Sequence, residues 1–259
     1  MLLVRVLYQR IPGLLGLLPL LIAWEVAGRL DLLFVLPPFT AVVSAGIELV
    51  VGGIFLPNFA GTLRSLLTGG TIAVLSGLTL GYGMARFRRV ESMFDIYVDI
   101  LLSAPVSAIV PVLVVLFGTS PSAIVATVVL SVFFVVTINA YSGFKQVDKE
   151  LLEMARSYRA SEFLTLRRVL LPAALPLLLT GMRLGIGRAF NGAVFGEMLI
   201  LLVGLGGLIM LYGSQFAFER LDAVIVLVVI TGVGSIWLFE RLERWLLARY
   251  QYQPTEARK

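Results

Sequence analysis

Polar residues stand inside one long apolar segment, and these side chains are well placed to act on a solute. Residues 175–200 contain Arg183, Arg188, Asn191 and Glu197. An ionisable side chain inside an apolar segment of membrane length is costly, so it is a functional candidate by default. Arginine attracts anions, whereas a carboxylate or an amide can hold a polar group in place. We therefore take Arg188, Asn191 and Glu197 as candidates for lining a pathway.

The two arginines of this segment have different interpretations. Arg183 lies near the start of the segment, where a long basic side chain can extend to the nearer membrane surface. Arg188 lies deeper, and it can face either an anion in the pathway or a carboxylate of a partner. Arg183 and Glu197 are fourteen residues apart, about 21 Å along a helix, so they cannot pair directly.

The chain contains no cysteine and no histidine. This composition excludes disulfides, thiol catalysis, structural zinc, haem ligation by histidine and proton relay by imidazole. The sequence also lacks the Gly-x-x-x-x-Gly-Lys-Ser/Thr loop that binds nucleotide phosphates. Without clustered carboxylates, it offers no arrangement of side chains for catalysis. We expect neither an enzyme nor a cofactor bound to this chain.

The connection Lys145–Ala174 is a second candidate functional segment. Loops of about 30 residues inside a compact protein are usually functional or disordered, and the leucines and phenylalanine among its charges argue against disorder. Asp148 can cap a helix that ends near Tyr158. Ser161 can cap a second helix that ends near Leu170. We expect two short amphipathic helices on the membrane surface.

The elements that must position these residues are membrane helices. Of the 259 residues, 59% are hydrophobic and 14% are charged, whereas a soluble domain carries about 25% charged residues. The mean hydropathy is +0.96. Because a span takes about 20 apolar residues, six segments qualify: 11–28, 62–85, 94–117, 123–143, 175–200 and 223–239. The sequence predicts a single all-α membrane domain of six spans over residues 1–259.

Basic residues set the orientation, because Lys and Arg concentrate on the cytoplasmic side. Most of the 21 basic residues fall in alternate connections and in the two terminal segments. They are Arg5, Arg10, Arg86, Arg88, Arg89, Lys145, Lys149, Arg156, Arg159, Arg167, Arg168, Arg241, Arg244, Arg249, Arg258 and Lys259. We expect both termini in the cytoplasm of a bacterium and the chain in its inner membrane. The apolar run after Arg10 is expected to be a retained first helix, since no convincing cleavage site follows it.

The connections between the spans are unequal. Gly118–Ser122 suits a tight turn between the third and fourth spans. Ala41–Val51 is amphipathic and is expected to form a helix at the outer interface. The glycines of Gly204–Gly207 predict a break, which a short helix on the outer face follows. Pro172 and Pro176 either separate the second loop helix from the fifth span or kink its entry.

Residues 153–172 resemble the EAA loop of the permease subunits of ABC importers. The family pattern is Glu-Ala-Ala, three residues, Gly, nine residues, Ile, any residue and Leu-Pro. The positions that match identically or conservatively are Glu153, Ala155, Val169, Leu171 and Pro172, with Met154 in place of the first Ala. Arg159 replaces the Gly that ends the first short helix. It costs about 1–2 kcal/mol if the left-handed conformation is kept.

Further motifs extend the resemblance over nearly the whole chain, to the sulfonate/nitrate/taurine branch of these permeases. They are Leu36–Pro38, Arg86–Arg89, Leu171–Pro176, Thr180–Leu184 and Gly196–Met198. The resemblance implies the type I importer permease fold and a small organic anion or oxyanion as solute. It implies as partners a second permease copy or homologue, two ATP-binding subunits, and a periplasmic or lipid-anchored binding protein. ATP and Mg²⁺ would bind the partner ATPase.

The resemblance also implies that the loop 145–174 is the coupling element, which lies in a cleft of the ATPase. The residues assigned to this contact are Asp148, Glu153, Met154, Ala155, Arg156, Tyr158, Arg159 and Pro172. Glu153 and Arg156 are spaced to pair on one helix face. Met154 and Tyr158 are spaced to form an apolar anchor beside them.

A stand-alone secondary transporter or channel is the alternative function. It would need coupling carboxylates deep in several spans. Asp95 and Asp99 lie near an inner boundary, and Glu197 is alone, so the sequence favours the importer permease.

Two pairs of small residues predict close helix packing. They are Gly77 with Gly81, and Gly181 with Gly185. We expect these contacts inside one subunit rather than between subunits.

Overall fold

The computed structural model describes residues 16–249, apart from residues 17, 32 and 202. In this part of the chain every regular element is a helix, so the all-α prediction is confirmed. Four helices are long and apolar enough to cross a membrane, or five if one bent pair counts as a single span. The described residues therefore do not contain six spans. Part of the predicted first span, residues 11–15 and 17, lies outside the described residues.

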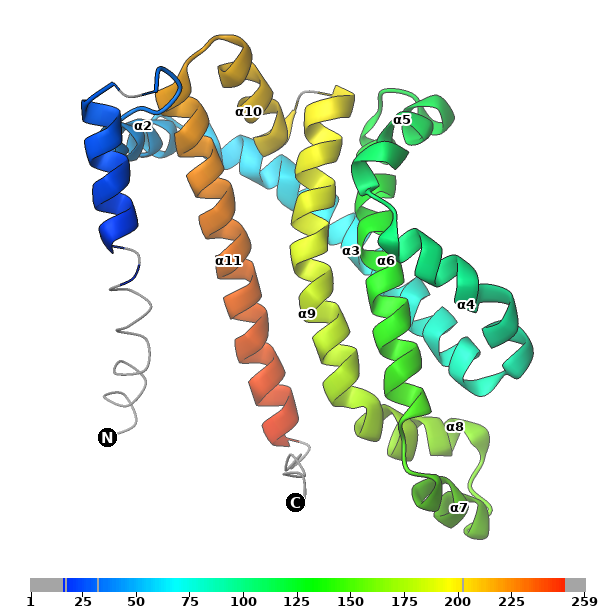
Figure 1. The fold of residues 1–259 in the computed structure, drawn as a ribbon. Helices are drawn as coiled ribbons and strands as arrows, with labels where there is room; N and C mark the ends of the chain where they lie inside the picture. Colours follow the sequence, from blue (N-terminus) through cyan, green and yellow to red (C-terminus); the bar gives the residue numbers. More distant parts are fainter. Residues whose placement is uncertain (1–15, 17, 32, 202, 250–259) are drawn as a thin grey trace, which may run out of the picture.

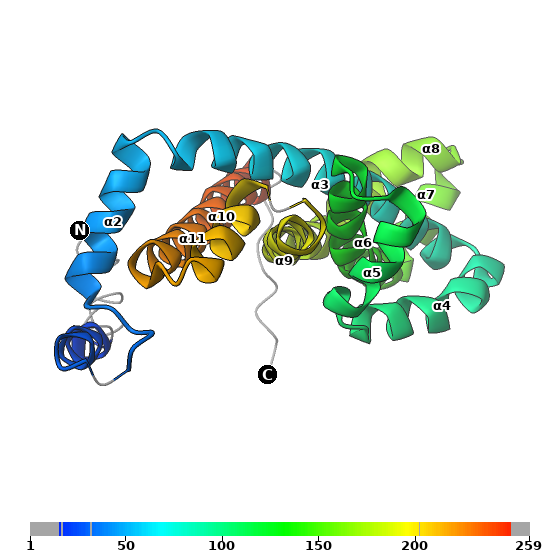
Figure 2. The same cartoon turned by 90° about the horizontal axis from the view of Figure 1, so that it is seen from above.

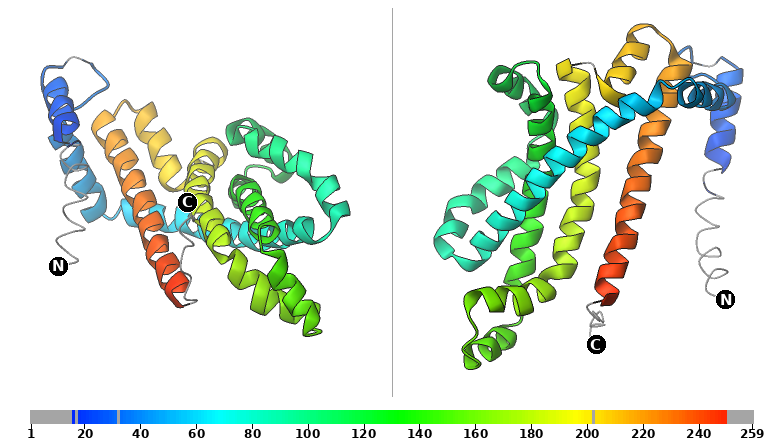
Figure 3. Two further views of the ribbon diagram at one scale, coloured as in Figure 1. Left: turned by 60° about the horizontal axis from the view of Figure 1, so that its bottom comes forward. Right: turned by 180° about the vertical axis from the view of Figure 1, so that it is seen from behind.

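The centre of the fold is a stack of three long helices: α3 (Phe55–Arg86), α6 (Pro121–Lys145) and α9 (Leu171–Gly196). α6 packs between α3 and α9, and α3 runs obliquely behind the others (Figures 2 and 3). The stack is close because glycines face neighbouring helices. A methyl group on Gly81 would meet Ala140, and further glycines of α3 and α9 meet α6 in the same way.

The predicted glycine contacts lie within one subunit. Gly77 faces Val136 of α6, while Gly181 and Gly185 face Asn139 and Val132 of the same helix. Both pairs therefore serve the packing of α3 and α9 on α6, which confirms the expectation. Small residues let the backbones approach, and close packing is a main source of helix association in lipid.

The third predicted span is bent rather than straight. Residues 94–117 fall in α4 (Arg88–Ser103) and α5 (Val106–Phe117), whose axes differ by 107°. The break lies at Ala104, which is extended with ψ 135°. The cause is Pro105, because a residue that precedes proline is driven out of the helical region. The turn after α5 lies where the sequence predicts it, since α6 begins at Pro121.

The loop 145–174 forms the two predicted helices. α7 (Lys149–Ser157) is followed by α8 (Glu162–Thr165), the π-helical turn η1 (Leu166–Leu170) and α9. From Glu162 the helix continues to Ile200 as one element of 39 residues. The prolines at its entry therefore do not separate the second loop helix from the membrane helix.

The other end of the molecule is built from short apolar helices. α2 (Phe39–Val51) packs on α11 (Phe218–Arg249), and α10 (Gly204–Ser214) packs against both α3 and α11. A helix over the predicted stretch 41–51 and a short helix after the fifth predicted span are thus both present. Gly204–Gly207 form the first turn of α10, however, and not the predicted break before it. In Figure 1, α2, α5 and α10 lie at one end, and α7, α8 and the end of α11 lie at the other.

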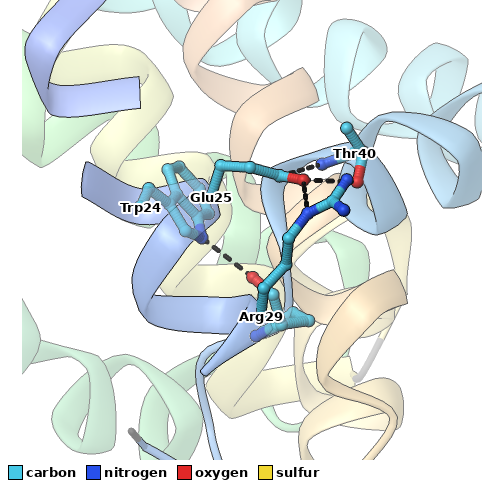
Figure 4. Close-up of polar contacts among 5 residues, drawn as sticks. Trp24, Glu25, Arg29 and Thr40 are labelled. Carbon is cyan, nitrogen blue, oxygen red and sulfur yellow. Dashed lines mark hydrogen bonds and ion pairs between the residues drawn. The ribbon is translucent and has the colours of Figure 1, made fainter. Parts of the chain in front are cut away.

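A polar contact holds the helix of residues 18–29 against the start of α2 (Figure 4). The Trp24 indole nitrogen donates to the Pro37 carbonyl at 3.0 Å. Glu25 accepts hydrogen bonds from Arg29 at 2.6 Å and from the Thr40 backbone N–H at 2.9 Å. This contact fixes how the helix of residues 18–29 meets the start of α2.

Candidate functional site

The two loop helices begin where the sequence predicts. Asp148 occupies the N-cap position of α7, although its side chain makes no capping hydrogen bond. Ser161 caps α8, since its hydroxyl oxygen accepts from the Leu164 N–H at 3.3 Å. Each helix therefore starts at a residue whose short polar side chain favours a helix N-terminus.

Arg159 keeps the left-handed conformation that glycine has in the family pattern. Its φ is 51°, and the Ala160 N–H closes the turn onto the Ala155 carbonyl at 3.0 Å. The turn between α7 and α8 is thus the expected one, and an arginine occupies it at a cost of about 1–2 kcal/mol.

The loop presents polar and apolar side chains outward. Ala155 is buried at 5% exposure, whereas Met154 and Tyr158 are 49% and 82% exposed. Glu153 and Arg156 are also exposed, and no ion pair joins them. An aromatic ring so exposed at the end of a short helix is a common anchor of protein interfaces.

An ion pair that sequence reasoning missed fastens this loop to the bundle. Arg86, the last residue of α3, pairs with Glu162, the first residue of α8. The two residues of this pair also line a cavity of about 380 Å³, together with residues such as Tyr82, Phe144 and Arg156. The basic cluster containing Arg86 was visible in the sequence, but its partner was not, because 76 residues separate the two.

A second ion pair ties α4 to α6 at the same end of the molecule. Glu91 accepts hydrogen bonds from Lys145 at 2.7 Å and from the Tyr141 hydroxyl at 2.5 Å. This contact joins α4 to α6 in addition to the packing of Val98 against Met84 and Phe134.

Two of the three predicted pathway residues share one exposed strip of α9. The strip consists of Leu184, Arg188, Asn191 and Phe195, and Leu199 of the π-helical turn that follows α9 is exposed as well. The strip residues alternate along the helix with the glycines of α9 that contact α6, such as Gly185 and Gly192. An arginine and an asparagine on a bare face of a membrane helix are suited to water or to a partner chain rather than to lipid.

Glu197, the third predicted pathway residue, is not on this strip. Its side chain is buried at 1% exposure. The carboxylate accepts hydrogen bonds from the Thr62 hydroxyl at 2.9 Å and from the Gly206 N–H at 3.0 Å. Glu197 thus joins α9 to α3 and α10.

Arg183 points toward α11 near the loop end of α9. Its guanidinium lies 3.5 Å from Glu243 and 3.9 Å from Glu240. It is separate from Glu197, as the spacing along the helix predicts.

An apolar groove of about 430 Å³ lies between α3, α9 and α11. Leu67, Ile186 and Phe239 are among its lining residues, and the few polar groups include Thr71 and Ser235. Arg188 and Asn191 lie outside this groove. The polar strip and the apolar groove are therefore separate surfaces of α9.

Comparison with known proteins identifies the family. Residues 69–251 match the model of the binding-protein-dependent transport system inner membrane component. The chain belongs to this family. It is a membrane-spanning permease component of the inner membrane and not itself an ATPase.

Two characterised relatives cover most of the chain. The formylaminopyrimidine transport permease protein of Halalkalibacterium halodurans is 29% identical over 93% of this chain and 96% of its own length. The taurine transport system permease protein of Escherichia coli is 28% identical over 87% and 86% of the two chains. The predicted sulfonate and taurine branch is confirmed by such relatives.

Solved structures confirm the fold. A chain of the MetNI methionine ABC transporter in an inward-facing conformation superposes with a TM-score of 0.62 at 20% identity, over 74% of this chain and 94% of that chain. A second inward-facing MetNI crystal form gives a TM-score of 0.53. The expected type I importer permease fold is thus present.

Proposed function

We propose that this permease forms the translocation pathway for a small organic anion or oxyanion and couples it to separate ATPase subunits through the loop 145–174. The observation that carries the coupling role is the surface of α7, where Met154 and Tyr158 are exposed beside charged residues. A stiff helix with an aromatic anchor is what a nucleotide-driven partner needs in order to push on the membrane domain.

The positions of the loop and the ion pairs support cytoplasmic docking. Basic residues gather at the end of the molecule that carries α7 and α8, and this end faces the cytoplasm by the distribution of Lys and Arg. The ATPases, with their ATP and Mg²⁺, would dock there. A substrate-binding protein would dock at the opposite end, where α2 and α10 lie.

Arg188 and Asn191 are the groups proposed to face the solute. They lie near the middle of a membrane helix on an exposed strip, where arginine would be expensive in contact with lipid. A second permease copy placed opposite the strip would enclose a polar passage. The positive charge of Arg188 favours an anionic group, which suits the sulfonate group of the taurine named in one relative's transport system.

Co-purification tests the coupling role. We would express this chain with its candidate ATPase and compare the wild type with Glu153→Lys. Glu219→Lys is the matched control, because Glu219 is an exposed glutamate at the opposite end of the molecule. The ATPase should elute with the wild type and the control, and Glu153→Lys should release it or uncouple its activity.

Failure of the ATPase to associate under any nucleotide condition would contradict this role. A stand-alone secondary transporter would then be the favoured function. It would show uptake that is driven by an ion gradient and does not need ATP. Asp95 and Asp99 on the exposed face of α4 would be its candidate coupling groups.

A further inference from the structure

We infer that Glu197 is a positioning residue that links the outer end of α9 to α10 and α3, so that movement of the coupling loop is transmitted to the outer face of the permease. This inference rests on the proposed coupling function and assigns the residues that carry the movement beyond the loop. It concerns a contact between helices and not a solute site.

The contact is a buried three-way junction. One carboxylate oxygen of Glu197 accepts from both the Thr62 hydroxyl of α3 and the Gly206 N–H of α10. The same Thr62 oxygen accepts from the Leu205 N–H at 3.0 Å. Thr62 is 0% exposed and Glu197 is 1% exposed. Buried polar groups joined in this way are costly to separate, because each would be left without a partner.

The geometry of the α10 N-terminus is built around this carboxylate. Gly204 has φ 65°, and a methyl group on it would overlap the Glu197 carboxylate. A methyl group on Gly206 would overlap the Val194 carbonyl of α9. The first turn of α10 thus lies directly on the Glu197 side chain. A negative carboxylate at a helix N-terminus is favourable, because the backbone N–H groups there carry partial positive charge.

The other end of the same helix is the coupling loop. From Glu162 to Ile200 the chain is helical without a break, a length of about 58 Å at 1.5 Å per residue. Irregular π-helical turns occur near both ends, η1 (Leu166–Leu170) beside the loop and η2 (Glu197–Leu201) at the junction. Such turns are frequent at functional positions in helices.

A continuous helix fixed at one end to the loop and at the other end to α10 must move both together. Displacement of α8 by an ATPase would therefore shift α10, provided that the junction holds. If the junction were broken, the loop would still dock on the ATPase, but α10 would no longer follow. This predicts a separation between ATP hydrolysis and the opening of the outer face.

A labelling experiment on the assembled complex tests this inference. Since the chain has no cysteine, Ser214→Cys, at the exposed end of α10, provides a single reporter for a membrane-impermeant maleimide. In the wild-type background, the labelling rate should differ about threefold or more between the nucleotide-free complex and the ATP-trapped complex, if α10 has two positions.

Two pairs of variants separate the junction from general stability. Glu197→Ala and Thr62→Val should abolish the nucleotide dependence and reduce uptake about tenfold, because each leaves buried partners unsatisfied. Glu197→Gln and Thr62→Ser retain an oxygen in the same place and should restore both. Thr137→Val is the matched control, since Thr137 is equally buried but bonds only to its own helix.

The possible outcomes separate failure of the junction from failure of the proposed coupling function. If the wild type responds to nucleotide and Glu197→Ala or Thr62→Val responds equally, the junction does not transmit movement and the inference is wrong. If Thr137→Val loses the response as well, the loss reflects general packing and the inference is also wrong. If the wild type itself does not respond because no ATPase binds, the proposed coupling function fails, and the inference fails with it.

Discussion

Two residues with left-handed backbone conformations mark the critical turns of this permease. Arg159 ends α7 with φ 51°, and Gly204 begins α10 with φ 65°. Glycine adopts this region without penalty, whereas arginine does not. The strain at the coupling loop and the tight fit at the outer junction can therefore be tested by single substitutions.

Arg159→Gly should stabilise the coupling loop. It removes about 1–2 kcal/mol of backbone strain, and the greater freedom of glycine in the unfolded chain takes back about 0.4–1 kcal/mol. Hydrogen exchange of residues 149–160 should be slower in the variant. Arg156→Gly, inside α7, is the control and should speed exchange. Faster exchange in Arg159→Gly would contradict the left-handed turn.

Gly204→Ala should destabilise the junction at α10. The substitution combines a left-handed backbone with overlap against Glu197, at a cost of about 1–3 kcal/mol. Gly213→Ala, in the same helix but with open space around it, should be neutral or stabilising. The thermal midpoint in detergent measures both. Equal midpoints for the two variants would show that the turn is not constrained.

At the scale of helices, small residues let α3 and α6 pack closely, and an ion pair joins the loop 145–174 to α3. Gly81 lies against Ala140 of α6, so α3 and α6 touch through their backbones. The coupling loop, in contrast, is attached to α3 through the exposed pair of Arg86 and Glu162. The loop helix α8 also continues directly into α9, so this ion pair adds a second contact to the bundle, and charge reversal can break that contact.

Gly81→Ala should lower the stability of the bundle by about 1–3 kcal/mol, because an added methyl group forces α3 away from α6. Gly70→Ala is the matched substitution in the same helix, since nothing lies within 4 Å of a methyl group there. Thermal unfolding should distinguish them. A loss of stability for Gly70→Ala as large as that for Gly81→Ala would argue against the α3–α6 contact.

Arg86→Glu should weaken coupling between the ATPase and the membrane domain, because it opposes Glu162 with a like charge. An exposed pair contributes about 0.2–1 kcal/mol, so the effect on transport per ATP hydrolysed should be a few-fold. The double reversal Arg86→Glu with Glu162→Arg should recover most of it. If transport per ATP hydrolysed does not recover in the double variant, the ion pair does not contribute to coupling.

The sequence predicts local elements well and distant contacts poorly. Capping residues located α7 and α8, and apolar runs located the long helices α3, α6, α9 and α11. The glycines near 204 indicated a change of element, but they form the first turn of α10. The bend before Pro105 was missed because a proline inside an apolar run is compatible with either a kinked span or a broken one. The Thr62–Glu197 hydrogen bond joins residues 135 positions apart, and a single threonine in an apolar helix carries no signal of such a partner.

At the scale of the whole molecule, a closely packed core of α3, α6 and α9 lies between two ends that carry different short helices. One end carries the coupling loop, and the other carries α10 and the contact of Glu25 with α2. Large apolar side chains such as Phe34, Val115 and Leu238 remain exposed, as expected of surfaces that meet lipid or a second copy. The strip with Arg188 and Asn191 adds a charged and a polar side chain to this surface.

The most direct test of the account is uptake and ATP hydrolysis measured together in proteoliposomes that contain this permease, its ATPase and its binding protein. Uptake of the anion should require ATP, and Glu153→Lys should abolish it, whereas Glu219→Lys should leave the ATPase bound. Arg188→Gln should reduce uptake while the ATPase stays bound. Uptake that proceeds without ATP and follows an imposed ion gradient would contradict the claim that this chain is the membrane component of an ATP-driven importer.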